Sequence, residues 1–327
     1  MTAMSRLEST YTRGITSDRM AQRYLITGSS GFIGSNISNY FEGNGHEVVR
    51  MDLIGDADII SDLRETDWED VDLSGFAGVI HLAAKISVPE SFEKPREYEE
   101  VNVRSTRRLF ESCVRAGVPR VVFASSAAVY GEVVGGVMKV GREGSPLSPY
   151  AKSKMAGEKL AEEVSTQETK ITCFRFFNVY GYGQSPKGQY ASVIPLFLEK
   201  IIKSEQINIF GNGEQTRDFI HVDDISETIL TAFSTNLPPF SVYNLGSGSS
   251  VSINQLVSTM SDIFAGFGIN VPPPSYSMAR NGDIENSVAD MQETREKFPD
   301  GVKISLKEGL LNQIGRTIHS SDALQKT

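Results

Sequence analysis

Cysteine is scarce in this chain of 327 residues, which contains only Cys113 and Cys173. Each lies in an apolar segment, and neither belongs to a group of residues with the spacing of metal ligands. We therefore expect two buried, reduced thiols, no bound metal and a cytoplasmic location.

An excess of positive charge and long apolar runs are also missing. Lysine and arginine number 32 against 41 acidic residues, and the resulting net charge of −9 argues against a general nucleic-acid-binding surface. No apolar stretch is long enough to span a bilayer, so we expect no association with membranes. Residues 1–19 are rich in Ser, Thr and Arg and lack the apolar core of a secretory signal, which predicts a flexible N-terminal tail.

Strand-like and helix-like segments alternate through the first half of the chain. This alternation predicts an α/β fold with a Rossmann-type doubly wound parallel sheet. After residue 176 glycine and proline become frequent and the elements shorten, which predicts a smaller C-terminal α/β domain. The predicted domains are 20–177 and 178–318, with some crossing of the chain between them and a second tail over 319–327. Strands are expected at 24–27, 46–51, 59–60, 78–83, 120–124 and 171–176, and the main helices at 32–41, 101–116 and 150–164.

A glycine-rich loop, residues 28–34, lies between the first predicted strand and the first predicted helix. Its glycines let the backbone approach a pyrophosphate, and the following helix N-terminus offers free N–H donors, although the spacing is G-x-x-G-x-x-G rather than G-x-G-x-x-G. Asp52 ends the second strand, where a carboxylate accepts both hydroxyls of an adenosine ribose and repels a 2′-phosphate. We therefore expect a dinucleotide site that favours NAD. The nearby cations Arg50 and Arg64 keep NADP open as an alternative.

Tyr150 and Lys154 are four residues apart on a predicted helix, so both side-chain heads lie on one face. The ammonium favours the phenolate, which is the direction needed to make tyrosine a base near neutral pH. Ser126 ends the segment before this helix. The spacing alone also fits an ordinary solvated helix pair, but beside a dinucleotide loop it indicates a hydride-transfer site.

Further motifs make the chain resemble the extended short-chain dehydrogenase/reductases, specifically the NAD-dependent sugar-nucleotide epimerase/dehydratase family. The resemblance covers residues 23–290 and is strongest to the UDP-N-acetylglucosamine and UDP-glucose 4-epimerases. It rests on motifs at 28–34, 62–63, 81–84, 102, 125–131, 150–154, 175–181, 211–219 and 280–283. The resemblance implies catalysis by Ser126, Tyr150 and Lys154. It implies that residues 20–177 bind NAD through Gly28, Gly31, Phe32, Ile33, Gly34, Asp52, Asp62, Leu63, Leu82, Ala83, Ala84, Asn102, Ser125, Tyr150, Lys154 and Phe176.

The residues after Ser126 discriminate between reactions within this family. The related 4,6-dehydratases carry Thr-Asp-Glu at the positions of Ser126, Ala127 and Ala128, and decarboxylases usually place Glu where Ala128 stands. Two alanines supply no group for proton transfer, so elimination and decarboxylation are disfavoured. The resemblance then implies oxidation at sugar C4 to a transient 4-keto sugar, followed by reduction from its other face. Tyr150 would act as the base, with Lys154 and the cationic nicotinamide lowering its pKa and Ser126 bonding the same hydroxyl.

The resemblance also implies that residues 178–318 hold the UDP-sugar. A small residue at the position of Ser287 admits an N-acetyl group in these epimerases, so UDP-GlcNAc and UDP-GalNAc are the expected substrates, with UDP-Glc and UDP-Gal also accepted. The family further suggests a homodimer that pairs helices 101–116 and 150–164. The implied substrate-binding residues are Ser87, Ser126, Tyr150, Asn178, Val193, Asn208, Phe210, Arg217, Arg280, Asp283 and Ser287.

Two other functions remain open from the sequence. One is epimerisation of another nucleotide sugar, such as a UDP-uronic acid, which would require an extra cation or hydroxyl in the sugar pocket. The other is an NAD-sensing regulator on the same fold, which the intact trio argues against. His81 and His221 are interpreted as structural residues, with His221 at the start of a helix.

Overall fold

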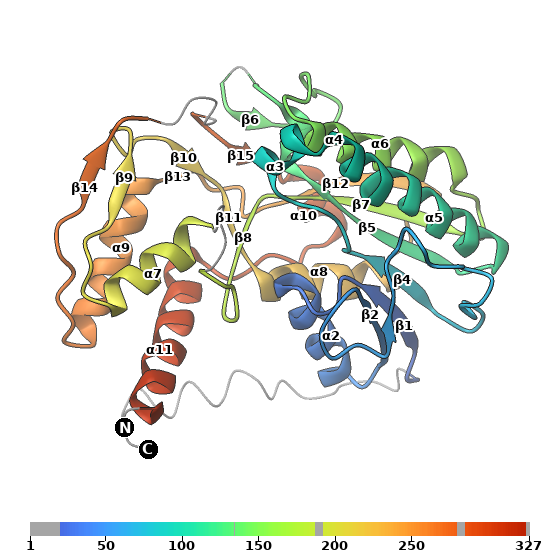
Figure 1. The fold of residues 1–327 in the computed structure, drawn as a ribbon, viewed down its shortest axis with the longest axis horizontal. Coiled ribbons are helices and arrows are strands. Elements are labelled where there is room, and N and C mark those ends of the chain that lie inside the picture. Colours follow the sequence, from blue (N-terminus) through green and yellow to red (C-terminus); the bar gives the residue numbers. More distant parts are fainter. Residues whose placement is uncertain (1–19, 134, 187–191, 280–284, 325–327) are drawn as a thin grey trace.

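The computed structural model describes residues 20–133, 135–186, 192–279 and 285–324. Its centre is a seven-stranded, wholly parallel sheet in the order β12-β7-β5-β4-β1-β2-β3, which confirms the predicted doubly wound fold (Figure 1). The strands are β1 (Arg23–Thr27), β2 (Glu47–Asp52), β3 (Ile59–Ile60), β4 (Gly78–His81), β5 (Arg120–Ser126), β7 (Lys170–Phe176) and β12 (Phe240–Leu245).

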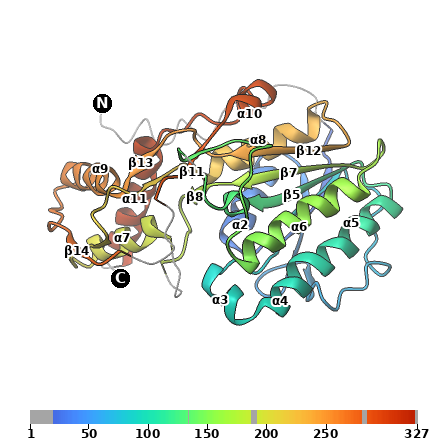
Figure 2. The same ribbon diagram turned by 90° about the horizontal axis from the view of Figure 1, so that it is seen from above.

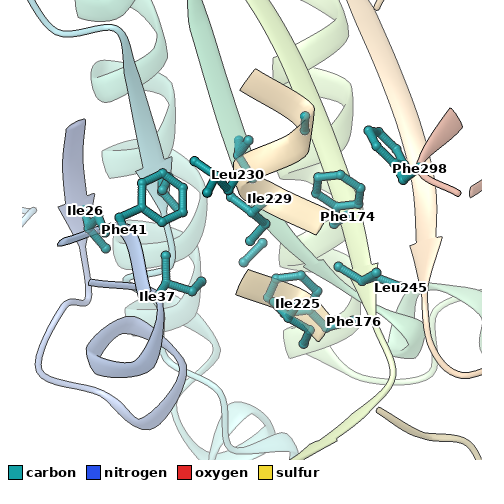
Figure 3. Packing of buried hydrophobic residues seen from close by; sticks show 14 of the residues in the cluster. Ile26, Ile37, Phe41, Phe174, Phe176, Ile225, Ile229, Leu230, Leu245 and Phe298 are labelled. Atoms are coloured by element: carbon teal, nitrogen blue, oxygen red, sulfur yellow. The ribbon is translucent and has the colours of Figure 1, made fainter. Parts of the chain in front are cut away.

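Both faces of this sheet are buried, because consecutive strand residues face opposite helical layers. On one face, Ile26 and Phe174 pack against α2 (Phe32–Gly43) and α8 (Val222–Ser234), as Figure 3 shows. On the other, Leu25 and Phe123 pack against α5 (Ser105–Arg115) and α6 (Pro149–Val164), which lie side by side in Figure 2. Cys113 and Cys173 are buried, unpaired thiols in this second layer, as predicted.

Strand β12 is a correction to the sequence analysis, which expected six strands in the first domain. After the chain has entered the second lobe, α8 returns to pack against α2 and β12 pairs with β7 at the sheet edge. The pattern of residues 240–245 is short and lies among glycine-rich segments, and its partner strand is about seventy residues away. Local pattern therefore could not assign it to this sheet.

The second lobe packs α7 (Val193–Ile202), α9 (Ile253–Gly266) and α11 (Leu306–Leu324) around its own apolar cluster. Helix α11 continues past residue 318, into the segment that the sequence predicts to be a tail. Among the described residues, no helix has both the length and the apolarity needed to cross a membrane. Short paired strands complete the lobe and its junction: β8 (Asn178–Tyr180) with β11 (Phe219–His221), β9 (Asn208–Phe210) with β14 (Ser275–Ser277), β10 (Thr216–Arg217) with β13 (Val251–Ser252), and β6 (Val137–Met138) with β15 (Val288–Ala289).

The helix predicted over 101–116 is longer and interrupted. It comprises α4 (Pro95–Glu99), a π-helical turn η1 (Glu100–Arg104) and then α5. A π turn of this kind often lies at a functional site, and this one carries Asn102. The remaining helices are α3 (Val88–Glu93), the 3-10 turn η2 (Ala127–Tyr130) and α10 (Gln292–Lys297).

Gly157 lets α6 lie directly on the sheet, and this close approach yields a stability prediction. A Cβ at Gly157 would lie 2.4 Å from the Phe123 ring, so Gly157→Ala should lower the free energy of unfolding by about 1–3 kcal/mol. Gly43, at the end of α2, has no atom within 4 Å of such a Cβ, so Gly43→Ala should instead stabilise by up to about 1 kcal/mol. Denaturant unfolding measures both changes. Equal midpoints for the two variants would contradict this account of the packing.

Candidate active site

The glycine loop forms a tight turn between β1 and α2. Gly28 has a φ of 74°, and a Cβ on Gly34 would lie 2.1 Å from the Gly28 carbonyl oxygen, so neither position accepts a side chain. Gly31 caps α2, whose first turn contains no acidic residue among the described side chains. The hydroxyl of Ser29 is buried and has no hydrogen-bond partner among the described residues. The N–H groups of the first turn of α2 have no partner within the helix, and together with the Ser29 hydroxyl they fit a pyrophosphate.

The end of β4 lies against the same turn. The Leu82 N–H donates to the Thr27 carbonyl at 3.1 Å, and a Cβ on Gly28 would meet the Ala83 nitrogen at 2.7 Å. The predicted cofactor segment 82–84 and the glycine loop are therefore brought together at the carboxyl edge of the sheet, where ligands bind in open α/β folds.

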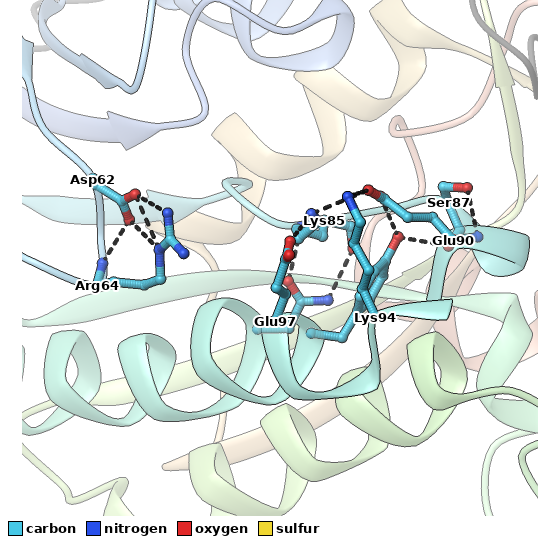
Figure 4. Close-up of polar contacts among 9 residues, drawn as sticks. Asp62, Arg64, Lys85, Ser87, Glu90, Lys94 and Glu97 are labelled. Carbon is cyan, nitrogen blue, oxygen red and sulfur yellow. Dashed lines mark hydrogen bonds and ion pairs between the residues drawn. The ribbon is translucent and has the colours of Figure 1, made fainter. Parts of the chain in front are cut away.

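Asp52 ends β2 beside the glycine loop. One of its carboxylate oxygens accepts the Ser30 N–H at 2.8 Å, and the other accepts the Leu53 N–H at 2.6 Å. The carboxylate is thus fixed where the sequence predicts a ribose acceptor. Asp62 lies beyond β3 and forms a two-pronged ion pair with Arg64, which lowers the pKa of Asp62 (Figure 4).

Three of the predicted cofactor residues direct their side chains into the protein. The carboxamide of Asn102 bonds the Lys85 backbone N–H and carbonyl at 2.8 and 2.9 Å and the Ser153 hydroxyl at 2.9 Å. The Ser125 hydroxyl donates to Glu158, and Phe176 belongs to the buried core. Their side chains therefore bond to or pack against the protein itself. Direct contact of these residues with the cofactor stays a prediction.

The proposed catalytic trio meets where β5 ends and α6 begins. Pro149 starts α6, and the side chain of Ser148 caps the helix by accepting the Ala151 N–H at 3.1 Å. This start places Tyr150 in the first turn, where its phenol is hydrogen-bonded to Ser126. Lys154, one turn further on, donates to the Ala124 carbonyl at 2.8 Å.

The direction of the Tyr150 pKa differs from the sequence prediction. Burial raises the pKa of Tyr150, and the Ser126 hydrogen bond opposes that rise. Lys154 does not offset it, because its ammonium points to the Ala124 carbonyl and lies 5.1 Å from the centre of the Phe123 ring. Burial also lowers the pKa of Lys154 to about 8. The lowering expected from Lys154 and the cationic nicotinamide is therefore not seen in this arrangement and stays a prediction for the NAD-bound enzyme.

The two histidines that the sequence analysis set aside are structural, as predicted. His81 is buried between the hydroxyls of Thr27 and Thr106, at 2.7 and 2.9 Å, and burial lowers its pKa to about 3. His221 caps α8 by accepting the Asp223 N–H at 3.2 Å.

Ser87, a predicted sugar contact, caps α3 through its side chain, which accepts the Glu90 N–H at 3.2 Å (Figure 4). Tyr98 donates to the Ser87 carbonyl at 2.6 Å, and its ring lies edge-on to the ring of Tyr150 at 6.4 Å. The segment around Ser87 thus contacts Tyr150 through Tyr98. Lys85, two residues before Ser87, is paired with both Glu90 and Glu97.

A cavity of about 450 Å³ in the second lobe gathers five of the eleven predicted substrate-binding residues. Asn178, Val193, Asn208, Phe210 and Arg217 all line it. Its wall is mainly apolar, which suits a nucleobase and ribose. Arg280 and Asp283 lie outside the described residues.

The sequence analysis did not name four polar residues that line this cavity: Gln184, Ser192, Lys200 and Gln215. Lys200 follows Val193 by seven residues on α7, so helical periodicity gives a signal that could have found it. The side-chain oxygen of Gln184 is buried without a hydrogen-bond partner in the described part of the chain, which leaves it able to accept from a ligand.

Ser287 is buried outside that cavity, immediately before β15. Its hydroxyl lies 3.6 Å from the Met138 sulfur, and the Val288 N–H donates to the Gly136 carbonyl at 3.0 Å. Strand β6 therefore fixes the segment that carries Ser287.

Known proteins share this arrangement. Residues 24–246 match the NAD dependent epimerase/dehydratase family. A putative UDP-glucose 4-epimerase of Methanocaldococcus jannaschii is 32% identical over 301 residues, covering 88% of this chain and 95% of that protein. The structure of MoeE5 in complex with UDP-glucuronic acid and NAD is 36% identical with a TM-score of 0.82, covering 91% and 99% of the two chains. A UDP-N-acetylglucosamine 4-epimerase of Methanobrevibacter ruminantium M1, solved with UDP-N-acetylmuramic acid, is 30% identical with a TM-score of 0.84, covering 92% and 99%.

The match extends over more than half of the chain and includes the glycine loop, the Ser126–Tyr150–Lys154 trio and most of the second-lobe cavity. The chain therefore belongs to the NAD-dependent epimerase/dehydratase family, in the branch of the UDP-sugar 4-epimerases.

Proposed function

We propose that this enzyme reversibly inverts C4 of a UDP-hexose and accepts N-acetylated sugars, with UDP-GlcNAc and UDP-GalNAc as substrates. The observation that carries the proposal is the trio of Ser126, Tyr150 and Lys154 beside the glycine loop, followed by Ala127 and Ala128. The trio can exchange a proton with a sugar hydroxyl. The alanines provide no acid or base for elimination.

The chain's own residues handle the proton at the sugar. Tyr150 takes it from the 4-hydroxyl and later returns it, while Ser126 is placed to bond the same oxygen. NAD, which the glycine loop and Asp52 would hold, would supply the hydride acceptor and donor for C4, and its cationic nicotinamide would favour the phenolate. Lys154, protonated at neutral pH, adds a second cation to the buried site.

The second-lobe cavity supports recognition of the nucleotide. Arg217 and Lys200 are cations suited to the diphosphate, and Arg217 carries the planar fork that matches phosphate oxygens. Phe210 offers an apolar face to the base, and the free oxygen of Gln184 can accept an N–H. UDP bound in this cavity would leave the sugar free to rotate in front of Tyr150.

Acceptance of the N-acetyl group rests on Ser287. The position is 5% exposed and is packed against Met138, so the side chain at 287 sets the space available beside β6. Ser287 does not line the second-lobe cavity, so its support for the proposal is the small size of its side chain at this packed position.

UDP-uronic acids are the second candidate, favoured by the 36% identity to MoeE5, which was solved with UDP-glucuronic acid. A uronate carboxylate requires a free cation or hydroxyl beside C5 of the sugar. Near the trio, Lys85 is paired with two glutamates, and Ala127 and Ala128 offer no hydroxyl. For these reasons we propose UDP-uronic acids only as the second candidate substrate.

Separate incubation with each UDP-sugar tests the proposed reaction. Purified enzyme should convert UDP-GlcNAc to UDP-GalNAc and the reverse, as followed by chromatographic separation of the products. Tyr150→Phe keeps the ring and loses the proton-transfer group, so it should retain bound NAD and turn over about 10²–10⁴-fold more slowly. Conversion of UDP-glucuronic acid alone would select the second candidate. Wild-type rates in Tyr150→Phe would contradict the assignment of the base.

Substitution at Ser287 tests the specificity proposal. Ser287→Tyr fills the space beside Met138 and should lower kcat/KM for N-acetylated substrates at least tenfold more than for UDP-Glc. Ser287→Ala keeps the side chain small and should leave the preference unchanged. If Ser287→Tyr reduces activity on all sugars equally, Ser287 has no part in choosing the substrate.

A further inference from the structure

Two buried charges lie directly behind the catalytic trio. Glu158 is on α6, one turn beyond Lys154, and Arg175 is on β7, next to the strand that ends in Ser126. Glu158 is 6% exposed and Arg175 4%, so both are removed from water. Neither takes part in the proton transfer proposed above.

The two side chains form a forked pair. The Arg175 Nε and one terminal nitrogen donate to the two oxygens of Glu158 at 2.9 and 2.6 Å, and the other terminal nitrogen contacts Glu143. The guanidinium also lies 4.7 Å from the centre of the Tyr130 ring. Such fork geometry fixes orientation as well as charge.

Glu158 connects this pair to the catalytic residues in two ways. It accepts the Ser125 hydroxyl at 2.5 Å, and Ser125 immediately precedes Ser126. It also lies four residues after Lys154 on the same helix face, where its charge acts on the ammonium. One carboxylate thus contacts the strand end that carries Ser126 and faces the catalytic lysine.

We propose that Glu158, held by Arg175, is a positioning residue that keeps Lys154 charged in its buried site and fixes the end of β5 beside it. The proposal rests on the role of Lys154 proposed above. Stability alone does not explain this pair, because burying two ions costs about as much as their attraction returns.

The groups that face Lys154 support this role for Glu158. Burial lowers the pKa of Lys154 to about 8, while Cys173 and Glu158 act in the opposite direction. Burial raises the pKa of the Cys173 thiol and lowers that of His81, so both are neutral near pH 7. Burial also raises the pKa of the Tyr150 phenol, which supplies no negative charge before the nicotinamide is bound. Among the described residues that face Lys154, Glu158 is therefore the carboxylate, held in place by its ion pair with Arg175.

The test is the pH dependence of kcat/KM for Glu158→Gln, measured on the holoenzyme with the UDP-sugar that the wild type converts. Removing the anion destabilises the ammonium, so Lys154 should lose its proton at a lower pH. The basic limb of the profile should then move down by about one pH unit or more. Glu162→Gln, the same substitution at an exposed position one turn further along α6, should leave the limb in place.

Glu158→Asp provides a graded variant, because it keeps the charge but draws it back by one methylene group. Its basic limb should fall between those of the wild type and Glu158→Gln, and it serves as the test if Glu158→Gln does not fold. A limb that stays at the wild-type pH, with activity reduced equally at every pH, would make the pair merely structural. Absence of turnover by the wild type on every UDP-sugar would instead overturn the proposed function and the role of Lys154 with it.

Discussion

Parallel strand pairing is the constraint on which the rest of this structure depends. Because β1, β4, β5 and β7 run in the same direction and in register, their last residues meet at one edge of the sheet. That edge receives the glycine loop from β1, segment 82–84 from β4 and Ser126 from β5. Backbone hydrogen bonds between the strands therefore bring these segments together, and their side chains lie close to one another at this edge.

The same edge is also where the fold carries buried charge. A sheet covered on both faces excludes water, which strengthens every electrostatic interaction around Lys154 but makes each unpaired ion costly. Forked ion pairs with several hydrogen bonds offset this cost, as between Glu158 and Arg175. The proposed catalytic Lys154 and the structural ion pair therefore lie on the same helix, one turn apart.

Much of this could be predicted from the sequence, because the informative patterns are local. The glycine loop, Asp52 and the Tyr150–Lys154 spacing each need only a strand or a helix to be placed correctly. The misses involve partners far apart in the chain. Strand β12 joins a strand about seventy residues earlier, and Lys200 reaches the cavity from a helix with no motif of its own. The pKa direction at Tyr150 follows from burial of the phenol, which spacing alone does not determine.

The segment that carries Ser287 shows how the second lobe depends on the first. Asp218, fully buried beside Arg217, accepts the N–H groups of Ser247 and Gly248 at the end of β12 and also that of Ala289 in β15. One carboxylate therefore joins the central sheet to the segment that carries Ser287. Because the returning strand β12 sets the position of this junction, the segment that carries Ser287 and the edge that carries Ser126 are held in one frame. If Ser287 chooses the substrate as proposed, a change there would therefore leave the proposed proton-transfer residues in place.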